Sequence, residues 1–264
     1  MRIFFLSLLV SISVSAQEPA LKILRTPAKE TLSKTMLEVA EQFLGKPYVP
    51  ATLEKTPESL VINLEEFDCF TLVENVLALS LAKHSPETGL DSYREYLQLL
   101  RYRNGVIDGY ASRMHYFTDW ALQATENGIL VNITEEVGEE QEKPIDFMSA
   151  NRKLYPALAT DDKALAEIVK AEKALNECPF FYVPKVKFSS VEEQIEEGDI
   201  IAFTSVIKGL DVNHEGIAVR KGRKLHLLHA SLDEKKVIIS KETLQQYLDR
   251  IKKHSGVMIF RPAR

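Results

Sequence analysis

The apolar pattern of this chain changes once, near Pro179, and that change constrains the fold more than any other feature. Before it, apolar residues recur at helical spacing in segments near residues 32–43, 69–83, 93–100, 112–128 and 161–177. After it, apart from a helical segment at 241–251, short runs rich in β-branched residues alternate with turn residues at 198–205, 214–220, 224–231, 236–240 and 256–262. Helices followed by strands predict an α+β fold with an antiparallel sheet.

The two halves are expected to be lobes of one domain. A chain of 264 residues is long enough for one substantial core. No Gly/Ser-rich or Pro-rich linker separates the halves, and the sequence contains no internal repeat. We therefore predict a single domain over residues 17–264, with a helical lobe at about 28–178 and a β lobe at about 180–264.

The first 16 residues have the layout of a secretory signal peptide. Arg2 precedes an apolar run from Ile3 to Val14, and Ser15-Ala16 supplies the small residues of a cleavage site. The run is shorter than the roughly 20 residues that a membrane-spanning helix needs. No cysteine follows the small residues to carry a lipid anchor. We expect cleavage near Ala16 and an exported, periplasmic protein without a membrane anchor.

The charge balance argues against a nucleic-acid partner. Lys and Arg number 33 against 38 Asp and Glu, and cleavage of the signal peptide would remove one more positive charge. Phosphate binding requires a basic face, which a net acidic composition does not favour. We expect no nucleic acid as partner, and we take a monomer as the default oligomeric state.

The stretch FDCFTLVENVLALSLAK places Cys69 at the start of a long apolar helix. Asp68 is a suitable N-cap, because its carboxylate can accept hydrogen bonds from the free N–H groups of the first turn. The positive end of the helix dipole should lower the pKa of the thiol, and a backbone N–H there could receive an oxyanion. Cys69 is therefore a candidate nucleophile. The alternatives are a buried packing residue or a disulfide with Cys178, which we otherwise expect to be free and partly buried.

A base for this cysteine can come from the segment NHEGIAVRKGRKLHLLHAS. If Lys221-Gly222 forms a two-residue turn, His214 lies directly opposite His229 on one face of a hairpin. His214 could take the proton of Cys69, and His229 could hold the other ring nitrogen of His214, as the third member of a catalytic triad does. The alternative is a pair of structural histidines in a half-buried sheet.

The histidines of the hairpin do not suggest a metal site. His226 and His229 are three residues apart on a predicted strand and therefore point to opposite faces. The segment HEGIAV lacks the second histidine of a zinc-protease helix. We expect neither a metal nor another cofactor.

These segments resemble the N-acetylmuramoyl-L-alanine amidase-like family of the NlpC-type (papain-like) cell-wall cysteine hydrolases. The resemblance implies a papain-like α+β fold, in which the helix of Cys69 packs on an antiparallel sheet or small barrel. It implies Cys69, His214 and His229 as nucleophile, base and third residue. Two positions depart from the pattern, because Glu215 stands where a small apolar residue is expected and Phe70 where a small polar residue is usual. The matching segments are FDCFTLVENVLAL, RYRNGVIDGYASRMHYFTDW, GDIIAFTSVIKGLDVNHEGIAV and KLHLLHASL, which span most of residues 65–232.

The reaction that the resemblance implies is hydrolysis of the amide bond between N-acetylmuramic acid and L-alanine in peptidoglycan or muropeptides, through a thioester on Cys69. Three alternatives stay open. The same triad could serve an endopeptidase that cuts the stem peptide after D-glutamate. The chain could be a non-catalytic peptidoglycan-binding module. The thioester could also acylate an amine instead of water.

The segment DGYASRMHYFTDW is too polar and aromatic to be only core. We predict that its side chains contact substrate, by stacking on a sugar and by pairing with a stem carboxylate. The alternative is a loop–helix junction in which Tyr116 packs and Arg113 is a satisfied charge. The predicted substrate-binding residues are Tyr110, Arg113, His115 and Tyr116.

Overall fold

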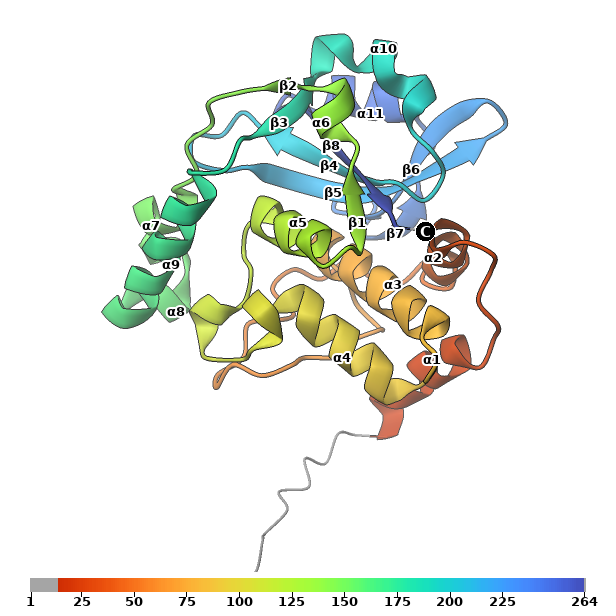
Figure 1. Cartoon of the computed structure of the whole chain (residues 1–264), viewed down its shortest axis with the longest axis horizontal. Coiled ribbons are helices and arrows are strands. Elements are labelled where there is room, and N and C mark those ends of the chain that lie inside the picture. The colour runs from red at the N-terminus through yellow and green to blue at the C-terminus, as the bar shows by residue number, and fades with distance from the viewer. Residues whose placement is uncertain (1–13, 264) are drawn as a thin grey trace, which may run out of the picture.

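The computed structural model describes residues 14–263, so most of the predicted signal peptide lies outside the described residues. Its centre is a sheet with the strand order β2-β3-β8-β4-β5-β6-β7, and β1 pairs with β8 as well (Figure 1). All pairings are antiparallel. A mixed structure of helices with an antiparallel sheet is thereby confirmed. The strands are β1 Leu130–Asn132, β2 Glu139–Glu140, β3 Phe181–Pro184, β4 Ile200–Ser205, β5 Val212–Lys221, β6 Lys224–Ser231, β7 Lys236–Ile239 and β8 His254–Pro262.

Helices lie on both faces of the sheet, and none of those between residues 14 and 263 is long and apolar enough to span a membrane. Short 3₁₀ turns occur at Arg103–Gly105, Tyr110–Ser112, Arg152–Leu154, Lys185–Lys187 and Glu192–Gln194. The helices are α1 Val14–Leu24, α2 Leu32–Glu41, α3 Cys69–His84, α4 Leu90–Arg101, α5 Phe117–Glu126, α6 Thr134–Val137, α7 Phe147–Ala150, α8 Pro156–Ala159, α9 Asp162–Leu175, α10 Phe188–Val191 and α11 Leu244–Arg250.

The sheet separates two hydrophobic cores because side chains alternate along its strands. On β4, Ile200 and Ala202 face the core that contains α1 to α5, whereas Ile201 and Phe203 face the core formed with α10 and α11. Figure 1 shows α3, α4 and α5 on one side of the sheet and α6, α10 and α11 on the other. A third, smaller core joins α7, α8 and α9 to the segment before α5.

The long predicted elements are present, with shifts at their ends. The helix predicted from residue 112 begins only at Phe117, because the residues before it form a 3₁₀ turn and an extended stretch. α1 buries Ala20, Ile23 and Leu24 in the main core, so the helical lobe begins before residue 28. The two- to four-residue strands β1 to β3 and the four-residue helices are too short to show a period in the sequence.

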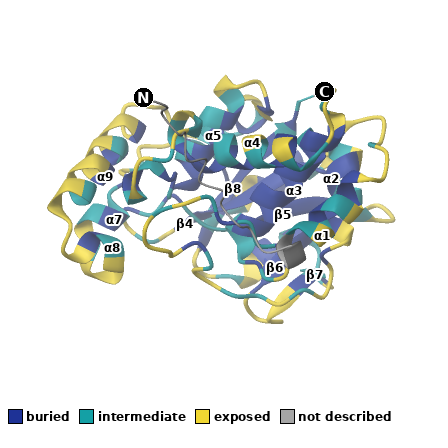
Figure 2. Cartoon of the chain, turned by 90° about the horizontal axis from the view of Figure 1, so that it is seen from below, coloured by how far each residue is buried: buried dark blue, intermediate teal, exposed yellow. Residues whose placement is uncertain are grey.

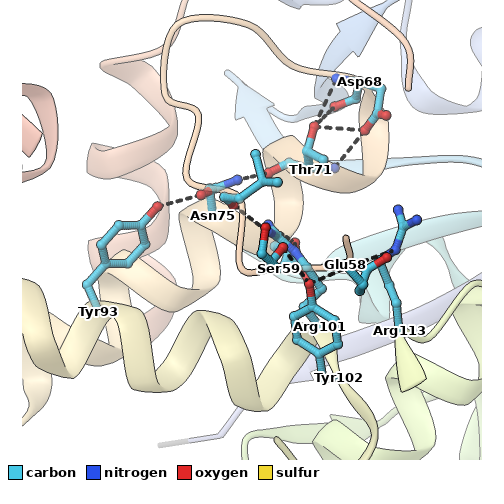
Figure 3. Close-up of polar contacts among 11 residues, drawn as sticks. Glu58, Ser59, Asp68, Thr71, Asn75, Tyr93, Arg101, Tyr102 and Arg113 are labelled. Atoms are coloured by element: carbon cyan, nitrogen blue, oxygen red, sulfur yellow. Dashed lines mark hydrogen bonds and ion pairs between the residues drawn. The ribbon is translucent and has the colours of Figure 1, made fainter. Parts of the chain in front are cut away.

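α3 is buried on almost every side, as its dark colour in Figure 2 shows. Its polar side chains are therefore paired inside the protein. Glu74 accepts hydrogen bonds from Nε and Nη2 of Arg101 at 2.8 and 2.6 Å. Asn75 donates to the Thr71 carbonyl at 2.6 Å and accepts from the hydroxyl of Tyr93 at 2.5 Å (Figure 3). These bonds fix α3 against α4 in one position along its axis.

The Glu74–Arg101 pair gives a direct test of this packing. Both side chains are at most 1% exposed, so Arg101→Met leaves a buried carboxylate without its partner and should cost about 3–5 kcal/mol of unfolding free energy. The double variant Glu74→Gln/Arg101→Met removes the orphaned charge and should recover much of that loss. Urea unfolding monitored by circular dichroism measures both values. Equal stability of Arg101→Met and the wild type would contradict this account of α3.

Candidate active site

Cys69 is the first residue of α3, and Asp68 caps the helix as predicted. The Asp68 carboxylate accepts from the Thr71 N–H at 2.8 Å, and the Thr71 hydroxyl accepts from the Asp68 N–H at 3.0 Å. Figure 3 shows this reciprocal pair at the head of the helix. The cap fixes the direction of the first turn, and with it the place of the Cys69 side chain.

The head of α3 packs where strands β5 and β6 separate. Their ladder runs from Lys221 opposite Lys224 to Ile217 opposite Leu228 and ends there. Beyond that point β5 stays paired with β4, and β6 stays paired with β7. The backbone N–H of Glu215 lies in this gap, and with the N–H of Phe70 it forms a hydrogen-bonding environment for the Cys69 thiol.

His214 and His229 are brought together, but not as direct neighbours across the hairpin. Nε2 of His214 lies 2.7 Å from Nδ1 of His229. The predicted register was wrong, because the two-residue turn is Gly222-Arg223 and Lys221 pairs with Lys224. Relative to the prediction, each residue of β5 lies opposite a residue two positions further along β6. Because this displacement is even, both histidines stay on the same face and contact each other diagonally.

Gly216 makes the close approach of the two histidines possible. A Cβ at this position would lie 2.9 Å from the Cβ of His229 and 2.7 Å from the carbonyl oxygen of Leu228. Neither distance is tolerable, so any side chain here would push β6 away from β5. The glycine thus permits the diagonal contact between His214 and His229.

Aromatic rings surround the histidine pair on the side of the second core. Phe203 stacks on His214 and on His254, with ring centroids 5.8 and 4.6 Å apart. Tyr247 of α11 lies edge-on to His229, with centroids 5.2 Å apart. Burial lowers the pKa of His214 well below its usual value and that of His229 to about 4. Both rings are therefore neutral at pH 7.

The thiol of Cys69 is also neutral in this environment, contrary to the expectation from the helix dipole. Burial raises its pKa well above the usual range, Glu215 raises it further when that group is ionised, and so does the Asp68 carboxylate. The N–H groups of Glu215 and Phe70 act in the opposite direction without prevailing. Cys69 and His214 are thus a thiol and a neutral imidazole at rest.

A cavity of about 140 Å³ lies beside the first turn of α3 and includes two predicted substrate-binding residues. Asp68, Phe70 and Thr71 line it from the helix, and Arg113 and His115 line it from the segment before α5. Burial and the Arg113 charge lower the pKa of His115 to about 3, so this ring is neutral.

Arg113 is held in the wall of this cavity by acidic side chains. It is 5% exposed, donates to Glu54 Oε1 at 2.9 Å and lies 3.4 Å from Glu58 Oε1 (Figure 3). A substrate carboxylate would therefore have to share Arg113 with Glu54 and Glu58.

The other two predicted substrate residues lie elsewhere. Tyr116 is buried, donates from its hydroxyl to Glu172 at 2.7 Å and accepts from the Met148 N–H at 2.8 Å. Tyr110 packs against the ring of His115, with centroids 4.4 Å apart, and does not line the cavity beside Cys69. The substrate contacts of Tyr110 and Tyr116 stay predictions.

Neither cysteine takes part in a disulfide. Cys178 is exposed rather than partly buried, and Cys69 is free. Within residues 14–263, no group of three or more His, Cys, Asp or Glu side chains is arranged to hold a metal ion. Tyr247, Phe203 and His254 were missed as neighbours of the site, because in the sequence they are ordinary apolar or isolated positions of a helix and two strands.

The pH dependence of thiol alkylation tests the resting state of Cys69. In a Cys178→Ser background, iodoacetamide should modify Cys69 slowly at pH 7, and the rate should still rise above about pH 8.5, where a free thiol is half ionised. Mass spectrometry of the modified peptide measures the rate. A plateau reached below pH 7 would show instead that a thiolate–imidazolium pair exists at rest.

Acid stability tests the burial of His229. A histidine whose folded pKa lies near 4 binds its proton more weakly than in the unfolded chain, so its contribution is present above about pH 6.5 and is lost as the pH falls towards 4. This contribution is about 3 kcal/mol, and His229→Asn should flatten the fall in unfolding free energy between pH 6.5 and 4 accordingly. Urea titrations at several pH values compare the slopes, and identical slopes would mean that His229 is charged in the fold.

Comparisons with known proteins agree with one another on the fold. An amidase from Bacteroides uniformis, an N-acetylmuramoyl-L-alanine amidase by name, is 40% identical over 88% of this chain and 99% of its own, with a TM-score of 0.84. A Bacteroides fragilis protein named a putative xylanase is 39% identical over 84% of this chain and 98% of its own, with a TM-score of 0.80. A Legionella pneumophila protein at 22% identity and a TM-score of 0.68 shares the fold.

No curated protein matches the chain. A protein-family model does, over residues 38–257, and it is described as AmiA-like, N-acetylmuramoyl-L-alanine amidase-like. The matched range contains Cys69, both histidines and the whole cavity beside α3. The chain belongs to the N-acetylmuramoyl-L-alanine amidase-like family.

Proposed function

We propose that this protein is a cysteine amidase that hydrolyses the bond between N-acetylmuramic acid and L-alanine in peptidoglycan or its muropeptides. The observation that carries the proposal is a cysteine at the first position of a capped, buried helix that packs on the two strands bearing a hydrogen-bonded histidine pair, in a chain of the amidase-like family. We assign the arrangement to the NlpC (papain-like) type, a proposal supported by a cysteine at the head of a buried helix and two histidines on adjacent strands of an antiparallel sheet.

The hydrogen bond between the histidines defines the role of each ring. Because Nε2 of His214 is engaged by Nδ1 of His229, Nδ1 of His214 is the nitrogen left to act as base. A neutral His214 with a free Nδ1 carries its proton on Nε2 and donates it to His229. His229 therefore holds His214 in the tautomer that can accept a proton from Cys69.

The reaction has two steps that share this base. Sγ of Cys69 attacks the carbonyl carbon of the lactyl amide while its proton passes to Nδ1 of His214. His214 gives that proton to the nitrogen of L-alanine, the C–N bond breaks, and a thioester remains on Cys69. Water then attacks the thioester and loses a proton to His214, which returns it to the sulfur as the muramic acid carboxylate leaves.

The head of α3 offers a site for the oxyanion of both tetrahedral intermediates. The first N–H groups of a helix have no acceptor within the helix, and Asp68 takes that of Thr71. The N–H groups of Cys69 and Phe70 belong to the same first turn and are the donors that we assign to the oxyanion. A neutral resting thiol fits this scheme, because proton transfer then accompanies attack.

We further propose that residues 1–16 direct export and that the enzyme acts on the wall as a monomer, outside the cytoplasm. The leader-like sequence before Gln17 supports export. The substrate class supports the same location, because peptidoglycan lies outside the cytoplasmic membrane.

The first experiment is product analysis with defined muropeptides. The wild type should release a stem peptide that begins with L-alanine, whereas Cys69→Ala should lose at least about 10³-fold in rate, because the covalent step is gone. Liquid chromatography with mass spectrometry identifies both products, and Cys178→Ser is the matched control that should keep full activity. Products cut after D-glutamate would move the scissile bond to the stem peptide.

Two further outcomes would replace the proposal. Binding of muropeptides without cleavage by any variant would indicate a non-catalytic module. Cleavage of xylan, tested because of the name given to the Bacteroides fragilis relative, would indicate glycoside hydrolysis, which relies on paired carboxyl groups instead of a thiol.

A further inference from the structure

Glu215 is a buried carboxyl group beside the nucleophile to which the mechanism above gives no role. It follows His214 on β5 and is 2% exposed. Ile217 and Val219 of the same strand pack in the core with α3, so Glu215 points to that side as well, towards the first turn of the helix. Neither of its carboxyl oxygens has a hydrogen-bond partner among the described residues.

The charges that surround Glu215 are of its own sign. Asp68 at the cap of α3, Asp211 directly before β5 and Glu74 within α3 all act on it. Arg101 of α4 does not compensate this charge, because it is bound to Glu74 and to the carbonyl of Val61. An ionised Glu215 would therefore be an unpaired charge in a buried acidic cluster, which is strongly unfavourable.

Two further groups face the thiol from other elements and do not offset this charge. Tyr48, from the segment before α3, and Tyr247, from α11, both have phenol groups whose pKa is raised by burial and by the Cys69 charge. His214 is neutral. Glu215 and Cys69 thus share a small region that contains no compensating cation among the groups acting on them.

We propose that Glu215 is a neutral carboxylic acid in the working enzyme, and that its ionisation keeps the Cys69 thiol protonated and inactive. Beside the carboxylates already there, the region can accept one further negative charge, either on the sulfur during attack or on the Glu215 carboxyl. When Glu215 loses its proton to solvent base, removal of the thiol proton becomes unfavourable, so Glu215 sets the upper pH limit of the reaction. Glu215 acts through the charge on Cys69 and does not contact substrate.

Burial of the neutral acid agrees with this role. Desolvation raises the pKa of Glu215 well above its usual value, and the three carboxylates around it act in the same direction. The group is therefore protonated at pH values where an exposed glutamate is fully ionised. The inference rests on the proposed function only in taking Cys69 as the nucleophile.

The test is the pH profile of Cys69 alkylation by iodoacetamide in the Cys178→Ser background. Glu215→Gln keeps the shape of the side chain but cannot ionise. The ratio of its alkylation rate to that of the parent should be near 1 at pH 6 and should rise about tenfold or more by pH 10, because a like charge within a few ångström shifts a pKa by about one unit or more. Glu193→Gln, an exposed substitution with the same change in net charge, should give a ratio near 1 throughout.

Glu215→Val provides a second variant in case the amide does not fold, and it should reproduce the pH-dependent ratio. A ratio that stays constant with pH, or that falls towards alkaline pH, would overturn the inference, since altered packing changes the rate at every pH alike. Alkylation needs no peptidoglycan. A failed amidase assay with the expected ratio would reject the proposed function alone, and cleavage of muropeptides with a constant ratio would reject this inference alone.

Thermal unfolding gives a readout that is independent of the thiol. A carboxyl whose pKa is raised by folding stabilises the fold less as the pH rises through that pKa. The melting temperature of Glu215→Gln relative to the wild type should therefore be higher at pH 8.5 than at pH 5. An equal difference at the two pH values would show that Glu215 is ionised in the fold and would also overturn the inference.

Discussion

The burial of α3 between the sheet and α4 is the constraint on which the rest of the site depends. A helix that packs on nearly all sides cannot slide or rotate without breaking its internal polar pairs, which are Glu74 with Arg101 and Asn75 with Tyr93. The position of its first residue follows from these contacts, not from any contact that Cys69 makes itself. The hydrophobic core and two buried polar pairs thus place the proposed nucleophile.

A second constraint comes from the sheet, which supplies the proposed partners of Cys69. β5 pairs with β6 as far as Ile217 and then leaves it, so the backbone beyond this point is free to interact with the head of α3. Near the same point, His214 of β5 and His229 of β6 lie on one face of the strand pair and form a hydrogen bond. Gly216 lies at the point of separation, and its missing side chain permits both the diagonal histidine contact and the close approach of the strands. One local irregularity therefore serves the thiol environment and the base.

The sequence predicted much of this site because its signals are local. The cap at Asp68, the helix from Cys69 and the shared face of His214 and His229 depend on residues close together in the chain, and each is confirmed. The exact hairpin register was wrong, because Lys221-Gly222 and Gly222-Arg223 are both acceptable two-residue turns and only packing distinguishes them. The neutral state of the thiol was missed for another reason. Burial is a property of the whole fold, and a dipole argument at one helix end contains no information about it.

The acidic surroundings of Cys69 have a consequence for how catalysis is timed. Alkylating agents and oxidants react with thiolates, so a thiol kept neutral by burial and by neighbouring carboxyls is protected while no substrate is present. Negative charge then develops on the sulfur only as it passes to a carbonyl oxygen, which the N–H groups at the head of α3 can stabilise. In the proposed mechanism, the field that disfavours a resting thiolate opposes this transfer less, because the charge moves from the buried sulfur towards the positive end of the helix dipole. The acidic environment thus keeps the Cys69 thiol unreactive at rest. In the proposed reaction, the N–H groups at the head of α3 stabilise the oxyanion that forms.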